Sequence, residues 1–551
     1  MLIKKLKTAF AALVLLGFQS QAQLNIQSGA TFFMQTGAQV TVQGNVDNAG
    51  TLNNDGALKV QGNYTNTGTY TGVGTAGILE MYGTGNSDLN AGASPIANLV
   101  INKTGVADIV KLTAIAVVNN SLTHTNGVFT TDPIANPSFR VTSPATATYT
   151  FAASKEIIGS VRRTSWTAGA ARVFNNTNMQ VTTNGGTSPT DLTVTMIPLS
   201  AGGDPTQTER EVKRKYTFTQ TAGSGFTTDV RYPYMTSELN TNTEANLVPW
   251  RLSGSEWNAR LTPVTRDAVN DYVSTTGIPA TELAQEWKLA DPNYTMNVTA
   301  NLRGPWNGVS AMNTTLQSAG TIPLLQPYNT TPFNYTGTES VASIPANVVD
   351  WVLIEHRKPS TSLPADALVA TISGREAGFL LNNGTVVELD GITPISVPIT
   401  KQGTAFITIR HRNHLGVLSN AIASNAVGTF TNDYTVLANS YKPGGSPSDP
   451  VVLLAGAGGK YGLWAGDASK NGIVNGGDII SIKAAIAILL SGYQFTDVNL
   501  NSAINGGDII STKTTVSLLG SGSGTNGRSG SSSNSTIKIV KSNIPDPIVE
   551  D

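Results

Sequence analysis

The chain has 551 residues, a formal net charge of −1 and no cysteine, and 13% of its residues are charged. The lack of thiols excludes disulfides and thiolate metal sites, and the balanced charge argues against a nucleic-acid-binding protein, which needs a basic face. The charged fraction is well below the ~25% of ordinary globular domains. The length predicts about three or four domains.

The first 22 residues have the layout of a secretory signal peptide. Three lysines up to Lys7 precede an apolar run from Ala9 to Gly17, and Ser20 and Ala22 are small residues where a signal peptidase reads the chain. The run is short for a membrane span, and no later run is long and apolar enough. We therefore expect residues 1–22 to be removed, no transmembrane segment in the mature chain, and a location outside the cell or on a bacterial cell surface.

Residues 23–135 are repetitive. The segment from Val40 to Val46 is echoed 18 residues later from Leu58 to Tyr64, and the Asn-x-Gly corners that follow also match. Short alternating strands with such corners predict a β-solenoid, in which Asn and Gly are expected for their tolerance of positive φ. An ordinary β-meander is the alternative.

The rest of the chain predicts a mainly β protein with one exception near its end. Short strands separated by Gly, Pro and Asn turns predict β-sandwich domains over residues 136–292 and 293–440. Residues 441–456 form a turn-rich linker, residues 457–520 a small helical module, and residues 521–551 a tail expected to be flexible.

Two near-identical twelve-residue segments, 467–478 and 497–508, define the helical module. Each places oxygen-bearing side chains at positions 1, 3, 5, 9 and 12, and the carbonyl of position 7 completes the pattern of an EF-hand loop around Ca²⁺. The predicted ligands are Asp467, Ser469, Asn471, Ile473 (carbonyl), Asn475 and Asp478 for one ion, and Asp497, Asn499, Asn501, Ala503 (carbonyl), Asn505 and Asp508 for the other.

The alternative interpretation of these segments is two Asn/Gly turns in front of two helices, and the match of both copies at five side-chain positions weighs against it. With only two carboxylates per loop, we expect affinities in the ~10⁻⁴ to 10⁻³ M range. Position 6 is Gly472 in the first loop and Ser502 in the second, where a sharp turn has a steric cost. The helix that follows is predicted to bury Ile479, Ile482, Ile486 and Leu489, and its copy to bury Ile509, Thr512, Val516 and Leu519.

The region from Gly462 to Gly520 resembles a type I dockerin, a module of two calcium loops that each precede a helix. The resemblance implies docking onto a cohesin-like or other surface protein, with Lys483 and Lys513 matching a lysine used in that contact. However, positions 10 and 11 of both loops are glycine pairs, where cellulosomal dockerins commonly carry side chains. The resemblance therefore supports the calcium sites more strongly than it supports binding to a cohesin-like partner.

A second resemblance covers the region from Asn307 through Ile354 and the segment from Arg410 to Gly416. These residues resemble multidomain, haemagglutinin-like surface proteins of Bacteroidetes. The resemblance implies a non-catalytic exported protein for adhesion or assembly, without identifying its ligand.

The alternative is a component of polysaccharide degradation, either a glycoside hydrolase or a carbohydrate-binding subunit. The acidic pairs Glu209/Glu211 and Glu388/Asp390 fall where solvated strand edges are expected, although a glycosidase needs two carboxylates across a sugar. No nucleophile-elbow or zinc-protease motif is present. A metal role for His411 and His414 competes with a polar loop at a strand end. Four tryptophans could stack on a glycan or lie in the core: Trp166, Trp250, Trp257 and Trp306.

Overall fold

The computed structural model describes residues 22–72, 76–199, 210–444, 446, 448–518 and 540–545. The expected signal peptide lies outside the described residues except for its last position, as does most of the expected tail. The chain is mainly β, with 43% strand and 10% helix, and begins with a β-solenoid of about seven turns. Of the described helices, none is long and apolar enough to cross a membrane.

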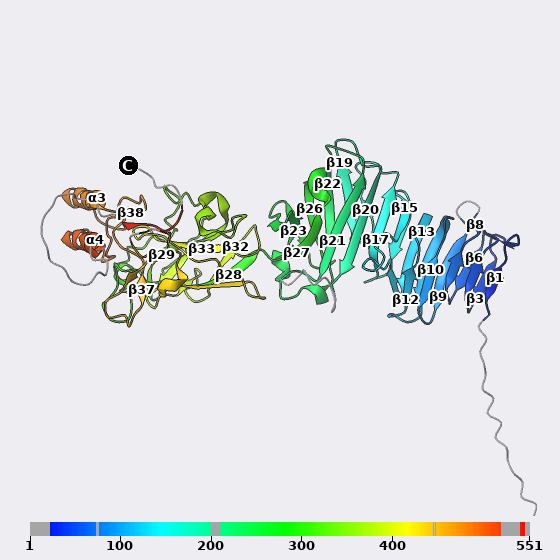
Figure 1. Ribbon diagram of the computed structural model, residues 1–551, viewed down its shortest axis with the longest axis horizontal. Coiled ribbons are helices and arrows are strands. Elements are labelled where there is room, and N and C mark those ends of the chain that lie inside the picture. Colours follow the sequence, from blue (N-terminus) through cyan, green and yellow to red (C-terminus); the bar gives the residue numbers. More distant parts are fainter. Residues whose placement is uncertain are drawn as a thin grey trace, which may run out of the picture. The chain divides into compact units, whose positions relative to one another are not determined.

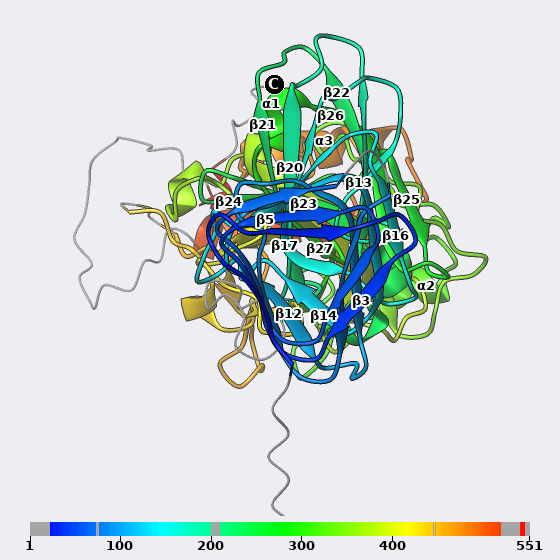
Figure 2. The ribbon, with the colours of Figure 1, turned by 90° about the vertical axis from the view of Figure 1, so that its right-hand side faces the viewer.

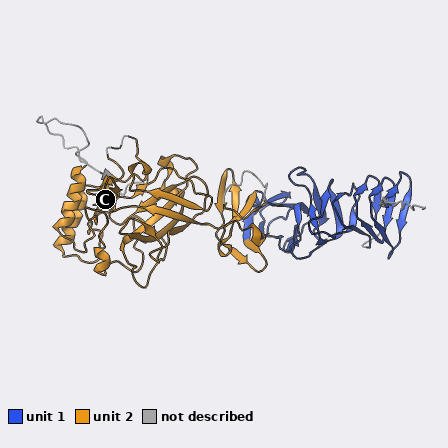
Figure 3. Cartoon of the chain, turned by 90° about the horizontal axis from the view of Figure 1, so that it is seen from below, with its two compact units in different colours: residues 1–198, 216–233, 276–284 blue, residues 199–215, 234–275, 285–551 orange. Residues whose placement is uncertain are grey.

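The chain divides into two compact units (Figure 3). Unit 1 comprises residues 1–198, 216–233 and 276–284, and unit 2 comprises residues 199–215, 234–275 and 285–551. The solenoid belongs to unit 1, and the predicted calcium loops belong to unit 2.

Parallel pairing builds the solenoid in the register that the sequence repeat predicts. Strand β3 (Gln39–Val42) pairs in parallel with β6 (Ala57–Val60), so that Val40 lies opposite Leu58. The prediction of a β-solenoid is therefore confirmed, and the alternative, an ordinary β-meander, is wrong. Parallel pairing still joins β15 (Arg140–Pro144) to β17 (Ile157–Thr164), beyond the boundary expected at residue 135.

The coils have three faces, which Figure 2 shows end-on as a three-sided outline in blue. The first face contains β1 (Leu24–Ile26), β4 (Val46–Asn48), β7 (Tyr64–Asn66), β10 (Ser87–Asn90), β12 (Ile109–Leu112), β14 (Val128–Thr130) and β17. The second contains β3, β6, β9 (Ile78–Gly83), β11 (Ile96–Lys103), β13 (Ala116–Asn126) and β16 (Thr148–Phe151). The third contains β2 (Thr31–Met34), β5 (Thr51–Asn54) and β8 (Thr69–Thr71).

Alternate side chains fill the interior of the solenoid. Val46, Leu58 and Tyr64 are fully or almost fully buried, and burial of this kind stabilises each side chain by roughly 1.5–3 kcal/mol. The corner asparagines stack as well, since Asn48 Nδ2 donates to Asn66 Oδ1 at 2.8 Å. The coils thus combine an apolar core with an internal amide ladder.

The glycines of two matching corners are required for a different reason from the one expected. Neither Gly50 nor Gly68 has a positive φ. A Cβ atom at Gly68 would lie 2.2 Å from the carbonyl oxygen of Gly50, and one at Gly50 would lie 2.4 Å from that of Ala30. Close stacking of successive coils, rather than left-handed backbone, therefore selects glycine here.

After the coils, unit 1 changes to antiparallel pairing. Strand β17 pairs with β20 (Asp191–Pro198), and β19 (Gln180–Asn184) pairs with β22 (Thr227–Pro233). The change of direction ends the solenoid.

Two sheets of unit 2, several of whose strands are labelled in Figure 1, share one hydrophobic core. The three-stranded sheet has the order β32 (Ile395–Pro398), β28 (Asn293–Thr299), β35 (Thr429–Asp433). The five-stranded sheet has the order β31 (Val386–Val387), β30 (Ile372–Leu381), β29 (Val348–Arg357), β33 (Phe406–Arg410), β34 (Val417–Leu418). All ten residues of β29 are buried, which explains its long apolar run.

The C-terminal segment packs against this core. Strand β36 (Val452–Leu453) pairs with β37 (Tyr461–Gly462), and β38 (Ile473–Val474) pairs with β39 (Val540–Lys541). Helices α3 (Gly476–Ala487) and α4 (Gly506–Leu518) contact each other. Residues 441–456, expected as a linker, include Val452 and Leu454, which are buried beside Trp464.

The predicted face of α3 is correct at Ile482 and Ile486, whereas Ile479 is only partly buried. Ile482 is fully buried, and Ile486 packs against its cluster with Ala468 and Val498. Leu489 was predicted wrongly: it lies beyond the end of the helix with φ +53° and is 86% exposed. In α4, Thr512 is buried as predicted, whereas Leu519 lies outside the described residues.

Candidate metal centre

The two candidate loops share a backbone conformation that wraps each chain around its acidic side chains. At position 6, Gly472 has φ +76° and Ser502 has φ +68°, so the sharp turn expected there is present in both loops. Position 4 is also left-handed, with φ +65° at Lys470 and +56° at Leu500. Non-glycine residues pay a steric cost for this conformation, which the surrounding hydrogen bonds offset.

The aspartate at position 1 organises the first half of each loop. Asp467 accepts hydrogen bonds from the backbone amides of Asn471 and Gly472, both at 3.0 Å. Thirty residues later, Asp497 accepts from Asn501 at 3.1 Å and from Ser502 at 2.9 Å. The same positions donate in both loops, so the sequence repeat is also a structural repeat.

The aspartate at position 12 closes each loop from the first turn of the following helix. Asp478 accepts from the backbone amide and hydroxyl of Ser469, each at 2.9 Å, and from the amide of Asn475 at 2.8 Å. Asp508 accepts from the amides of Asn499 at 3.3 Å and Asn505 at 2.9 Å. The carboxylates at positions 1 and 12 thus hold opposite ends of one loop together.

The predicted ligands at positions 5 and 9 are engaged with the backbone. Asn475 and Asn505 each cap a helix by accepting from the amide two residues on, at 2.6 and 2.7 Å. Asn471 Oδ1 accepts from Ile473 at 3.0 Å, and Asn501 Oδ1 does the same with Ala503. Each amide oxygen has a second lone pair, so these contacts leave room for the predicted roles.

The acidic side chains are buried in an unfavourable electrostatic environment. Burial, together with repulsion from Asp478, raises the pKa of Asp467 to about 7. Burial also raises the pKa of Asp497 to about 6, although Arg412 partly opposes the shift. Among the described residues, no basic side chain forms an ion pair with Asp467 or Asp478. A bound cation would relieve this repulsion.

The donor set fits a hard cation. The described residues hold no group of three or more His, Cys, Asp or Glu side chains that could bind a metal, so a transition-metal site built from such groups is absent from them. Each loop instead offers two carboxylates with amide and carbonyl oxygens, and the first loop adds the hydroxyl of Ser469. These are ligands that Ca²⁺ accepts. Asp478, Asp497 and Asp508 are fully buried and Asp467 is 7% exposed.

A buried polar segment after β33 connects both loops to the five-stranded sheet. The side-chain amide of Asn413 donates to the carbonyl oxygens of Phe495 at 3.0 Å and Asp497 at 2.7 Å. The backbone carbonyl oxygen of Asn413 accepts hydrogen bonds from the backbone amides of Gly466 and Asp467, both at 3.2 Å. Asn413 therefore touches the backbone of position 1 in both loops.

Arg412 provides a second connection, to the residues that precede the second loop. Its guanidinium contacts Asp350 Oδ2 at 2.8 Å, donates to the carbonyl of Gln494, and lies 4.1 Å from the ring centroid of Tyr493. The Tyr493 hydroxyl donates to Asp350 Oδ1 at 2.6 Å. Burial would raise the pKa of Asp350, but Arg412 and His411 outweigh it and hold the pKa at about 2.

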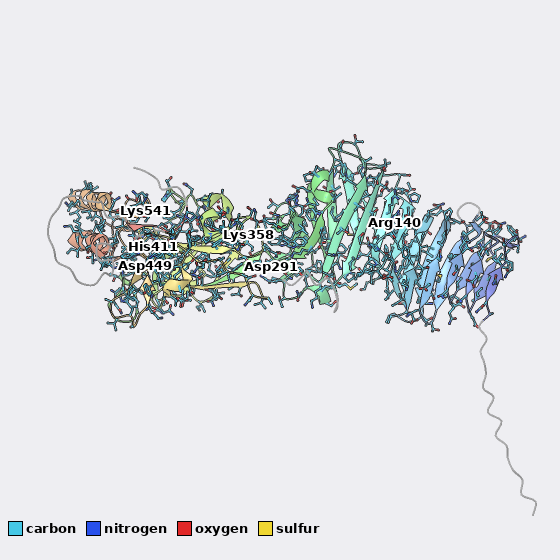
Figure 4. All side chains as sticks on the ribbon, in the orientation of Figure 1. Arg140, Asp291, Lys358, His411, Asp449 and Lys541 are labelled. Atoms are coloured by element: carbon cyan, nitrogen blue, oxygen red, sulfur yellow. The ribbon has the colours of Figure 1, made fainter. Side chains whose placement is uncertain are left out.

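His411 (Figure 4) and His414 form a buried hydrogen-bonded pair. They follow β33, as the polar-loop interpretation predicts, and their Nδ1 atoms are 3.1 Å apart. His414 Nε2 accepts from the amide of Gly304 at 3.0 Å, and His411 Nε2 lies 3.1 Å from Asp350 Oδ2. Burial lowers the pKa of both imidazoles, although Asp350 partly opposes the shift at His411.

Sequence reasoning missed Asn413 and Arg412 as supports of the loops. Its only available signal was a run of polar residues directly after an apolar strand. The matched lysines Lys483 and Lys513 are exposed on α3 and α4. Ile480 and Ile510, on the same helices, are 68% and 65% exposed.

The other candidate residues do not form a second centre within the described residues. Glu209 lies outside them, and Glu211 is buried 3.5 Å from Lys288. Glu388 accepts from the amide of Ser396 at 2.6 Å. Asp390 accepts from Thr393 within a turn.

The tryptophans expected in the core or on a glycan divide into two pairs. Trp166 and Trp250 are buried, and their indole nitrogens donate to Thr183 and to the carbonyl of Ala290. Trp257 and Trp306 are partly buried against the core of unit 2. The core interpretation is therefore correct for the first pair.

No protein-family model, no curated protein and no solved structure matches this chain.

Proposed function

We propose that segments 467–478 and 497–508 bind two calcium ions within a dockerin-like module. The observation that carries this proposal is the repeated pair of buried carboxylates at positions 1 and 12, held by equivalent backbone donors in loops thirty residues apart. Calcium would supply positive charge between the two carboxylates of each loop, and the oxygens of the predicted positions would bind it.

We further propose that the chain is an exported, non-catalytic protein of the cell surface or extracellular space, serving adhesion or assembly. The solenoid and sheets supply an extended set of rigid β elements, and the helical module supplies a docking face. Lys483 and Lys513 are exposed at equivalent positions of α3 and α4, next to the exposed Ile480 and Ile510. Exposed apolar residues beside cations suit contact with a protein partner.

Calcium binding is tested by the stability of the full chain with and without calcium. A ligand that binds only the folded state stabilises it, by about 1.4 kcal/mol per site at a concentration of ten times Kd. The wild-type chain should therefore gain stability in millimolar calcium. The double variant Asp478→Ala/Asp508→Ala should lose that gain.

The control is Asp449→Ala, because Asp449 is 43% exposed and pairs only with Lys442 among the described ionic groups. This variant should keep the full calcium response. An equal response in the double variant would show that the two loop carboxylates are not ligands.

The docking face is tested separately by Lys483→Glu/Lys513→Glu. Because both side chains are exposed and neither lysine is a predicted ligand, this variant should keep its calcium response. It should lose at least tenfold in affinity for a partner captured by the wild-type module. Unchanged affinity would exclude this face from docking.

A further inference from the structure

Residues 540–545 return to the body of unit 2 and fill a groove there. Strand β39 pairs antiparallel with β38 of the first loop, placing Lys541 (Figure 4) opposite Ile473. The amide of Ser542 donates to the carbonyl of Gly472 at 2.9 Å. One side of the groove is thus a loop backbone that a strand can extend.

The opposite side of the groove recognises one asparagine. Asn543 is 5% exposed. Its Oδ1 accepts from the amide of Leu418 at 2.8 Å, and its Nδ2 donates to the carbonyl of Leu418 at 3.1 Å and to that of Tyr441. Ser542 Oγ donates to the carbonyl of Gly416 at 2.7 Å. A side chain of another shape would leave some of these backbone groups unpaired.

The next residue occupies an apolar pocket. Ile544 is 7% exposed and packs with Ala367, Phe406 and Leu418. Gly416 leaves space for it, because a Cβ atom there would lie 2.6 Å from Ile544 Cδ1. The groove therefore has the features of a peptide-binding site: backbone pairing, one polar anchor and one apolar anchor.

The chain between α4 and this segment is long enough to reach elsewhere. Residues 519–539 link Leu518 to Val540 and are rich in glycine and serine. A segment of this length spans up to about 70 Å when extended. A segment exchanged between two copies makes the same contacts as the chain's own.

We propose that this groove is a peptide-binding site and that it accepts residues 540–545 of a second copy of the chain. Exchange of the segment links copies without a new interface. Occupancy from the same chain predominates when the protein is dilute, since the linker sets a high local concentration. The fraction of grooves occupied by the segment of a second copy increases with protein concentration.

The test combines two variants that damage opposite halves of the contact. Gly416→Leu fills the isoleucine pocket and leaves the segment free, whereas Asn543→Ala weakens the segment and leaves the groove free. Each variant alone should be monomeric in light scattering, and an equimolar mixture should form a one-to-one heterodimer. A mixture that stays monomeric would overturn the proposal.

A second measurement tests the proposal without the Gly416→Leu variant, in case that variant misfolds. The chain ending at residue 539 should bind a synthetic peptide of residues 538–546, and an Asn543→Ala peptide should bind at least tenfold more weakly. Absence of binding, or equal binding of both peptides, would also overturn the proposal. Because β39 pairs with the first loop, binding is measured with and without calcium. The tenfold loss for the Asn543→Ala peptide should appear in both, since Asn543 and Ile544 contact residues outside the calcium loops, and this result does not depend on the calcium proposal.

Discussion

The side-chain amide of Asn413 donates a 2.7 Å hydrogen bond to the carbonyl oxygen of Asp497. The backbone carbonyl oxygen of Asn413 also accepts a hydrogen bond from the backbone amide of Asp467. One buried residue therefore joins the start of both candidate loops to the five-stranded sheet. The helical segment is thus continuous with the core of unit 2. Ordering of the loops by calcium should therefore stabilise the five-stranded sheet, because Asn413 lies in the segment between its strands β33 and β34.

Replacing Asn413 with alanine should weaken both the fold and the loops. The carbonyls of Phe495 and Asp497 would lose their donor, and each unsatisfied buried group costs roughly 1–3 kcal/mol. We expect a loss of about 2–4 kcal/mol in urea unfolding and a lower calcium affinity. The matched control is Asn420→Ala, which removes an exposed hydrogen bond to Ala438 and should change stability by less than about 1 kcal/mol. Equal effects of the two variants would contradict the coupling.

The solenoid corners provide an independent prediction. Gly68→Ala places a Cβ atom 2.2 Å from the carbonyl oxygen of Gly50, so the coils must separate. Such overpacking typically costs about 1–3 kcal/mol, and thermal unfolding of the first unit should occur at a lower temperature. Ala49→Ser, at an exposed position of the matching corner one coil earlier, should leave the unfolding temperature unchanged. If both variants melt alike, coil stacking does not explain the glycine.

Glu376 predicts a stability change at alkaline pH. Burial and the negative charges of Glu339 and Glu388 raise its pKa from 4.5 to about 8. The folded state therefore holds this proton more tightly, and the associated stability is complete below pH ~4.5 and is lost as the pH rises through about 8. Glu376→Gln keeps a neutral donor, so it should match the wild type at pH 4 and exceed it by roughly 1–3 kcal/mol at pH 9.

The measurement for Glu376 is chemical unfolding at both pH values. Asp88→Asn serves as the control, since the side chain of Asp88 is 48% exposed. It should show the wild-type pH profile. A Glu376→Gln profile parallel to that of the wild type would show that this carboxyl does not titrate differently in the folded state.

The repeats in the sequence predicted the parts of the structure that depend on local pattern. The pairing of Val40 with Leu58 follows from an 18-residue repeat, because successive coils place equivalent residues in contact. The turns at Gly472 and Ser502 follow from a 30-residue repeat in the same way. Repetition constrains register, so these features could be inferred without knowing the rest of the fold.

Features that depend on distant segments could not be inferred. Asn413 and Asp497 are separated by 84 residues, and no local pattern links them. Leu489 continues the apolar spacing of α3, yet the helix ends at Ala487 and the side chain is exposed. Likewise, the composition of the last residues favours a flexible tail, but the contacts of Asn543 and Ile544 hold part of it in a groove.

The most direct test of the central claim is the number of calcium ions bound by the full chain, measured by isothermal titration calorimetry. The account predicts two ions per chain, with dissociation constants of ~10⁻⁴ to 10⁻³ M, and none for Asp478→Ala/Asp508→Ala. If the wild-type chain binds no calcium at millimolar concentration, or if the double variant binds two ions, the assignment of the two loops is contradicted.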